Sequence, residues 1–163
     1  MSGADRYRDL LAAVEELVEW NETVPVIVEG VRDVRALRAI GLEGVIEPVN
    51  HGEAVFALCE RLGRTHKKAV ILTDWDRRGG QLAHLLRDGL AANGVRPIED
   101  PRSKLARLCQ KDIKDVESLD GYVARARDAL EEGKTDGKDS KRYYGRARSR
   151  ILEGRGRRRP GEP

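Results

Sequence analysis

The sequence predicts an α/β fold, in which a parallel sheet of about four strands has helices on both faces and further helices follow the sheet. Short β-branched runs alternate with segments that repeat apolar residues every three or four positions, as strands joined by helices do. The first of these runs, at 24–28, is apolar throughout, which is typical of a parallel strand buried on both faces. The chain has 163 residues, 39% of them hydrophobic, which is enough for one compact domain with its own core.

The first half of the chain is predicted to alternate helices and strands. Residues 5–20 place apolar side chains on one helical stripe with acidic side chains opposite, so they form the first helix. VPVIVEG at 24–30 is the first strand, residues 32–40 return to helical spacing, and GVIEPV at 44–49 is the second strand. The next helix has an apolar stripe that places one cysteine in the core: Ala54, Val55, Leu58, Cys59 and Leu62.

The second half supplies two more strands and ends in helices. KAVILTD at 68–74 is the clearest strand and GVRPIE at 94–99 a weaker one, and the helix between them has a stripe of Leu82, Leu85, Leu86 and Leu90. Leu105 and Leu108 then indicate a short helix. A longer amphipathic helix follows and should pack back on the domain, with its stripe at Val116, Leu119, Val123, Ala126 and Leu130.

Charge is distributed unevenly along the chain. The net charge of +3 combines +7 in residues 134–163, which hold 11 basic and 4 acidic residues, with −4 in the rest. Such a basic segment is typical of contact with nucleic acid or another polyanion, and we expect phosphate contacts from Lys141, Arg142, Arg146, Arg148 and Arg150. Glycine, lysine and arginine dominate it, so we predict disorder in isolation. The predicted parts are an N-terminal helix (1–21), an α/β core (22–100), a helical extension (101–131) and a basic tail (132–163).

Composition argues against several classes of protein. No apolar run approaches the roughly 18 residues that a membrane helix needs. The first residues, MSGADRYRDL, lack the apolar block of a secretory signal. Cys59 and Cys109 lie far apart without CxxC spacing, which argues against a disulfide framework or a structural zinc site. We therefore expect a cytoplasmic protein that has no membrane partner.

Acidic residues follow two of the predicted strands. Glu29 ends the first strand and precedes Gly30, while Asp74 ends the third strand and Asp76 stands two residues further on. Side chains at i and i+2 of an extended segment point to the same side, so Asp74 and Asp76 should face one pocket. If the first and third strands are neighbours, Glu29 joins them at the edge where parallel sheets bind ligands.

Three carboxylates in one pocket repel one another unless a cation lies between them. Mg²⁺ is the natural cation, with Mn²⁺ as a substitute, because it takes carboxylates together with waters and substrate phosphates. Arg77 and Arg78 come next, at a helix start that also favours anions, so we expect at least one of them to contact phosphate. A structural alternative stays open, in which Asp76 only caps the helix that begins near Arg77.

Two motifs in this order resemble the Toprim domain, which is shared by primases, topoisomerases, OLD-type nucleases, recombination mediators and small RNA-maturing nucleases. VIVEGVRDVRAL, and about forty residues later VILTDWDRRG, match its Glu-Gly and Asp-x-Asp-x-x-Gly patterns with Glu29, Gly30, Asp74, Asp76 and Gly79. The resemblance covers residues 22–100 and implies a Rossmann-like, three-layer fold with a Mg²⁺-dependent site. It implies that Glu29 is a general acid/base or metal ligand and that Asp74 and Asp76 are metal ligands.

The resemblance is closest to small stand-alone Toprim proteins of archaea and bacteria. Trp75 stands where the family usually has proline, and it either stacks on a base or shields the loop. EPVNHG at 47–52 is similar to the turn after the second strand of the small RNA-maturing nucleases. Asn50 and His51 lie in this predicted turn at the active edge and are candidate phosphate ligands, and His51 could instead shuttle a proton. Asp33 either binds metal through water or, as we favour, caps a helix.

Three functions fit these observations to different degrees. The leading one is metal-assisted cleavage or transfer at a phosphodiester of RNA or DNA, with Glu29 handling the proton. The second is a non-catalytic nucleic-acid-binding accessory module, against which the complete acidic set argues. The third is a phosphotransferase of the haloacid-dehalogenase type, which also carries Asp-x-Asp, but after its first core strand and not after the third.

Overall fold

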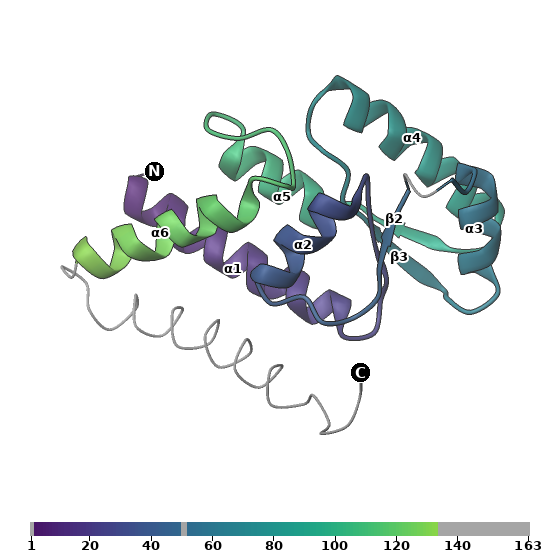
Figure 1. The fold of residues 1–163 in the computed structure, drawn as a ribbon, viewed down its shortest axis with the longest axis horizontal. Helices are drawn as coiled ribbons and strands as arrows, with labels where there is room; N and C mark the ends of the chain where they lie inside the picture. Colours follow the sequence, from purple (N-terminus) through teal and green to yellow (C-terminus); the bar gives the residue numbers. More distant parts are fainter. Residues whose placement is uncertain (1, 50–51, 134–163) are drawn as a thin grey trace.

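The computed structural model describes residues 2–49 and 52–133, and these form a four-stranded parallel sheet with helices on both faces (Figure 1). The predicted α/β class, the parallel sheet and the C-terminal helices are therefore confirmed. In chain order the elements are α1 (Gly3–Asn21), β1 (Val26–Val28), α2 (Val31–Ala39), β2 (Ile46–Pro48), α3 (Val55–Gly63), β3 (Lys68–Ile71), α4 (Arg77–Ala92), β4 (Arg96–Ile98), α5 (Asp100–Cys109) and α6 (Leu119–Gly133).

The strand order places the first and third strands side by side. The sheet runs β2-β1-β3-β4, and all three pairings are parallel, with Val26 opposite Val70 and Ile27 opposite Ile71. The chain therefore moves from β1 outward to β2 and then back across β1 to β3. Such a reversal is the point at which doubly wound sheets bind their ligands, outside the carboxyl ends of the strands.

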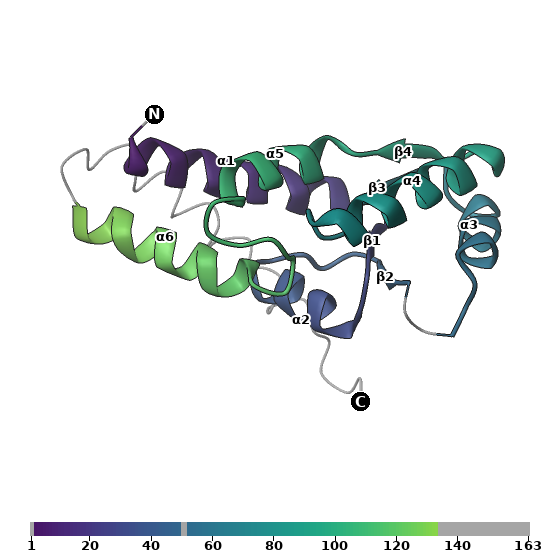
Figure 2. The ribbon, with the colours of Figure 1, turned by 90° about the horizontal axis from the view of Figure 1, so that it is seen from above.

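Alternate strand residues face two separate apolar cores. Ile27 and Ile71 point towards α3 and α4, where Cys59 is also buried as predicted. Val28 and Val70 point to the opposite face, which α1, α2, α5 and α6 cover. In Figure 2 α5 and α6 lie alongside α1, away from α3, so the helical extension packs back on the domain as expected.

Three details differ from the sequence prediction. The strands have only three or four residues each and are shorter than the predicted runs, so that β3, for example, ends at Ile71 and not at residue 74. Leu85, expected on the buried stripe of α4, has 51% of its surface exposed because the helix turns it outward. Val116 is buried as expected, but it precedes α6 and belongs to the linker between α5 and α6.

No helix within 2–49 or 52–133 is both long and apolar enough to cross a membrane.

Candidate metal site

The ends of β1 and β3 bring two carboxylates together. Glu29 follows β1 and Asp74 lies three residues beyond β3, on the same edge of the sheet. The backbone N–H of Asp74 donates to Oε2 of Glu29 over 2.9 Å. This contact joins residues 45 positions apart in the chain. It follows directly from the pairing of the two strands, and the structure brings Glu29 and Asp74 together as the sequence predicts.

Asp74 lies in surroundings that disfavour its charge. Partial burial and a hydrogen bond shared with the Glu29 carboxyl raise the pKa of Asp74 to about 8, and the negative charges of Glu29 and Asp33 add to the effect. The N–H of Val116 donates to Oδ1 of Asp74 over 2.9 Å and opposes the shift only in part. In the absence of a cation, these surroundings favour the protonated form of Asp74 well above the pH at which an ordinary aspartate ionises.

Asp33 is a buried helix cap beside this pair. Its carboxylate accepts from the N–H of Gly30 over 3.0 Å at the start of α2, and only 7% of the residue is exposed. Burial raises the pKa of Asp33, and the charges of Glu29 and Glu117 act in the same direction. The capping role that the sequence favoured is confirmed, and Asp33 adds negative charge behind the carboxylate pair.

Asp76 is engaged at the start of α4. It is the N-cap of that helix, and its Oδ1 accepts from the N–H of Gly79 over 2.7 Å. The capping alternative for Asp76 is thus present in the structure. Within residues 2–49 and 52–133, no three histidine, cysteine or acidic side chains are grouped closely enough to hold a metal ion. Glu29 and Asp74 form a pair, and Asp76 does not complete it into a group of three.

Gly79, the glycine of the Asp-x-Asp-x-x-Gly segment, packs closely against the backbone of Asp74. A Cβ on this residue would lie 1.8 Å from the carbonyl oxygen of Asp74, so a side chain cannot be accommodated there without moving the backbone. The carbonyl of Gly79 also accepts from Oγ1 of Thr73 over 2.7 Å. The first turn of α4 therefore lies directly against the segment that carries Asp74.

The linker between α5 and α6 closes over the same segment. The backbone N–H of Trp75 donates to the carbonyl of Lys114, and its indole Nε1–H donates to the carbonyl of Ile113 over 2.7 Å. The half-buried indole also packs against the core under α1. Of the two roles expected for Trp75, the structure supports shielding and anchoring of the loop.

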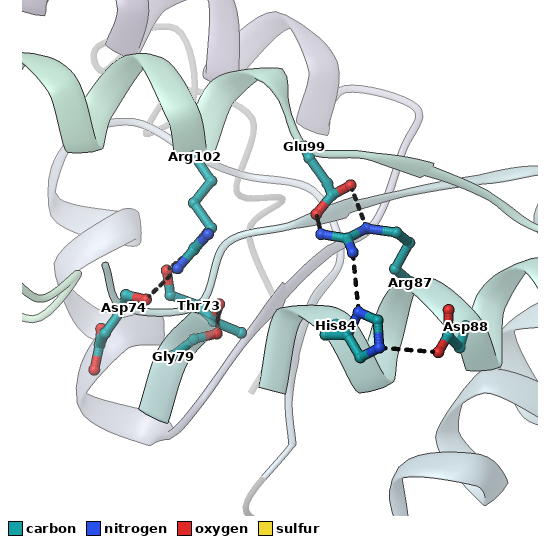
Figure 3. Close-up of polar contacts among 8 residues, drawn as sticks. All are labelled: Thr73, Asp74, Gly79, His84, Arg87, Asp88, Glu99 and Arg102. Carbon is teal, nitrogen blue, oxygen red and sulfur yellow. Dashed lines mark hydrogen bonds and ion pairs between the residues drawn. The ribbon is translucent and has the colours of Figure 1, made fainter. Parts of the chain in front are cut away.

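Arg102 completes the contacts around Asp74. From α5 its Nε donates to the carbonyl of Thr73 over 3.0 Å and its Nη2 to the carbonyl of Asp74 over 2.8 Å (Figure 3). The sequence predicts neither Arg102 nor the role of Val116 at this site. Arg102 is one of 31 basic residues, and Val116 acts through its backbone N–H, so neither carries a signal in a single sequence.

The remaining predicted residues divide into two groups. Arg77 and Arg78 are exposed at the beginning of α4, as expected. Asn50 and His51 lie outside the described residues, and so do the predicted tail positions Lys141, Arg142, Arg146, Arg148 and Arg150.

Comparison with known proteins places the chain among archaeal relatives. No family model matches it. The UPF0292 protein of Methanosarcina barkeri is 42% identical over 132 residues, which are 78% of this chain and 92% of that protein. The UPF0292 protein of Methanocaldococcus jannaschii is 32% identical over 117 residues, covering 72% of this chain and 91% of that protein.

A solved structure of a protein from Aquifex aeolicus is similar in fold. It superposes with a TM-score of 0.57 over 66% of this chain and 94% of its own, at 22% sequence identity. At that identity the similarity concerns the fold alone. The identity to the two archaeal proteins extends over most of each chain, and this chain belongs to the UPF0292 family.

Proposed function

We propose that this protein is a Mg²⁺-dependent enzyme that cleaves or transfers phosphodiesters in nucleic acid. The observation that carries the proposal is the pairing of Glu29 with Asp74 at the carboxyl ends of β1 and β3. These strands flank the point where the strand order reverses, which is where doubly wound sheets bind ligands. The motifs around both residues are those in which the sequence resembles the Toprim domain.

The donor set fits Mg²⁺. This ion is usually held by one or two carboxylates with waters and substrate phosphates, and only rarely by a complete protein cage. One oxygen of each carboxylate is oriented by a backbone N–H, that of Asp74 for Glu29 and that of Val116 for Asp74. Burial, the hydrogen bond to Glu29 and the charges of Glu29 and Asp33 raise the pKa of Asp74, and a bound divalent cation would favour its charged form. Asp76, whose Oδ1 caps α4, is not part of this donor pair.

Each residue of the edge has a role in this proposal. Bound Mg²⁺ would polarise a phosphoryl oxygen and lower the pKa of a coordinated water. Glu29 would accept or return a proton at the attacking or leaving oxygen. Arg77 and Arg78, exposed at the start of α4, would contact neighbouring phosphates. A Cβ on Gly30 would meet no atom within 4 Å, which leaves open space beside Glu29 for a substrate.

The test is an incubation of the full chain with end-labelled RNA and DNA pools, with Mg²⁺, with Mn²⁺ or with chelator. We expect metal-dependent cleavage or transfer that is lost in Glu29→Gln and Asp74→Asn. Asp88→Asn is the matched control, because Asp88 is an exposed acid on α4 whose partner is His84. Activity that persists in both site variants, or that needs no metal, would contradict the proposal.

The charge of residues 134–163 favours a second candidate, a nucleic-acid-binding accessory module without catalysis. Their net charge of +7 suits a polyanion whether or not the site reacts. The same pools distinguish the two functions. A module would bind without changing the length of any labelled strand, and Glu29→Gln would bind as well as the natural chain.

A further inference from the structure

Arg102 holds the backbone of Asp74 from outside the α/β core. Its guanidinium forms a fork over two consecutive carbonyls, those of Thr73 and Asp74, which follow the last residue of β3. Figure 3 shows the carboxylate of Asp74 pointing away from Arg102, so the contact is with the main chain. Arg102 belongs to α5, which follows the last strand of the sheet.

We propose that Arg102 is a positioning residue for the candidate metal site: it fixes the Thr73–Asp74 backbone so that the Asp74 carboxylate faces Glu29. The inference rests on the proposed function, because it assigns to Arg102 an effect on metal binding at that site. It adds a residue of the helical extension to a site otherwise built from the strand ends.

The surroundings of Asp74 support a positioning role. Its N–H is held by Glu29, its Oδ1 by the N–H of Val116, and its carbonyl lies against Gly79. Arg102 restrains the backbone on both sides of the Asp74 Cα, because one planar group holds the carbonyls of two successive peptides, Thr73–Asp74 and Asp74–Trp75. A rotation of either peptide would move the Asp74 side chain relative to Glu29 and Val116.

A second arginine provides a matched control. Arg87 of α4 forms a similar fork, but on the carboxylate of Glu99, with donor–acceptor distances of 2.8 and 2.7 Å (Figure 3). This pair also joins α4 to the region where α5 begins. Its bonds involve neither Glu29 nor Asp74, although the Glu99 carboxylate lies close enough to Arg102 for their charges to attract. Arg87→Ala therefore removes a fork of the same geometry without loosening Asp74.

The experiment compares Arg102→Ala, Arg102→Lys and Arg87→Ala with the natural chain. Calorimetric titration with Mg²⁺ alone gives the affinity, and Asp74→Asn shows whether that binding belongs to the site. Amide hydrogen exchange of Asp74 and Val116 in metal-free protein reports the positioning itself. Thermal melts of each variant in chelator give the stability.

We expect Arg102→Ala to weaken Mg²⁺ binding about 10–100-fold, as loss of a residue that orients a metal ligand commonly does. The amides of Asp74 and Val116 should exchange faster. Arg87→Ala should change neither the Mg²⁺ affinity nor the exchange of these amides, even if its melting temperature falls as much as that of Arg102→Ala. Lysine offers a single ammonium in place of the fork. Arg102→Lys should therefore bind Mg²⁺ almost as weakly as Arg102→Ala.

Several results would overturn the inference. They are unchanged amide exchange in Arg102→Ala, an equal loss of affinity in Arg87→Ala, and full recovery by Arg102→Lys, which would show that charge alone acts. Failure of the proposed function looks different. In that case the natural chain would show no Mg²⁺ binding that Asp74→Asn abolishes, while the exchange of Asp74 and Val116 would still test whether Arg102 holds the segment.

Discussion

At the residue scale, two glycines of the site stand in opposite surroundings. A Cβ on Gly79 would lie 1.8 Å from the Asp74 carbonyl oxygen, whereas a Cβ on Gly30 would meet no atom within 4 Å. Gly30 also has an extended backbone, with φ −151° and ψ 179°, which any residue can adopt. Packing within the protein therefore requires glycine at position 79 and does not require it at position 30.

We predict that Gly79→Ala and Gly30→Ala separate folding from function. Gly79→Ala should lower the free energy of unfolding by at least about 1–3 kcal/mol, because the backbone must move to admit the methyl group. Gly30→Ala should cost about 1 kcal/mol or less, through its position as a helix N-cap, yet reduce activity by obstructing substrate beside Glu29. Urea titrations and the nucleic-acid assay decide this. A stable, fully active Gly30→Ala protein would remove the argument that substrate occupies that space.

The second residue-scale prediction concerns the proton on Asp74. The ordinary pKa of this carboxyl is 3.8, and burial and the hydrogen bond to Glu29 raise it to about 8 in the fold. Between these values the folded protein holds a proton that the unfolded chain has lost. The contribution to stability is therefore complete below about pH 4, falls as pH rises, and is absent above about pH 8.

Asp74→Asn should remove this pH dependence. Asparagine resembles the protonated aspartate, since it can accept from Val116 and donate to Glu29. We expect the stability of the natural chain in chelator to fall relative to the variant between pH 4 and pH 8. Denaturant titrations at several pH values measure that difference. Mg²⁺ binding to the natural chain should also release a proton near pH 7, so its affinity should rise with pH. Parallel stability curves for the two proteins would contradict the assigned titration.

The sequence could predict some of these residues and not others. The recognisable patterns of strand ends and helix starts predict Glu29, Asp33 and Asp74. The pairing of β1 with β3 then brings Glu29 and Asp74 together, and Asp33 caps the helix after β1. Asp76 and Trp75 each had two possible roles that spacing cannot separate. Contacts between distant parts of the chain decide them, namely Gly79 with Asp76 and Ile113 with Trp75.

At the element scale, the apolar pattern sufficed to predict each strand and helix but not their ends. KAVILTD was predicted as a strand to residue 74, whereas β3 ends at Ile71. Leu72 and Thr73, which follow β3, are fully buried although they lie outside the strand, and Arg102 of α5 holds the carbonyl of Thr73. Burial therefore continues past the end of the strand, and the apolar pattern does not show where the strand stops. This early end matters for the site. Outside the strand Asp74 and Asp76 no longer alternate in a pleat, and they turn to different partners.

The linker between α5 and α6 contains a second feature that the apolar sequence pattern does not predict. Val116 fits the helical stripe that runs from Leu119 to Leu130, and its burial agrees with that stripe. Its backbone N–H is nevertheless free for Asp74 because the helix has not yet begun. The helical extension is therefore part of the site as well as cover for the sheet. A sequence pattern cannot reveal this, because the contact is made by main-chain atoms.

At the scale of the whole molecule, charge is divided between the acidic first part of the chain and the basic residues that follow. Residues 1–133 carry −4 and residues 134–163 carry +7. An acidic body repels a polyanion, even though the proposed chemistry requires carboxylates at the reacting phosphate. We infer that the basic residues supply affinity for nucleic acid while the sheet edge supplies the chemistry. This division rests on the sequence, since residues 134–163 lie outside the described structure.

Truncation after Asp139 tests that division. The truncation removes nine basic and two acidic residues, a net +7, and leaves a chain of net −4. Each phosphate contact releases condensed counterions, so the logarithm of the binding constant falls with the logarithm of salt at a slope set by the number of contacts. We expect the truncated chain to bind nucleic acid more weakly and with a flatter slope. Its Mg²⁺ affinity should be unchanged, because Glu29, Asp74 and Arg102 remain. Filter binding at several salt concentrations gives both slopes, and equal slopes would mean that these residues are not the binding arm.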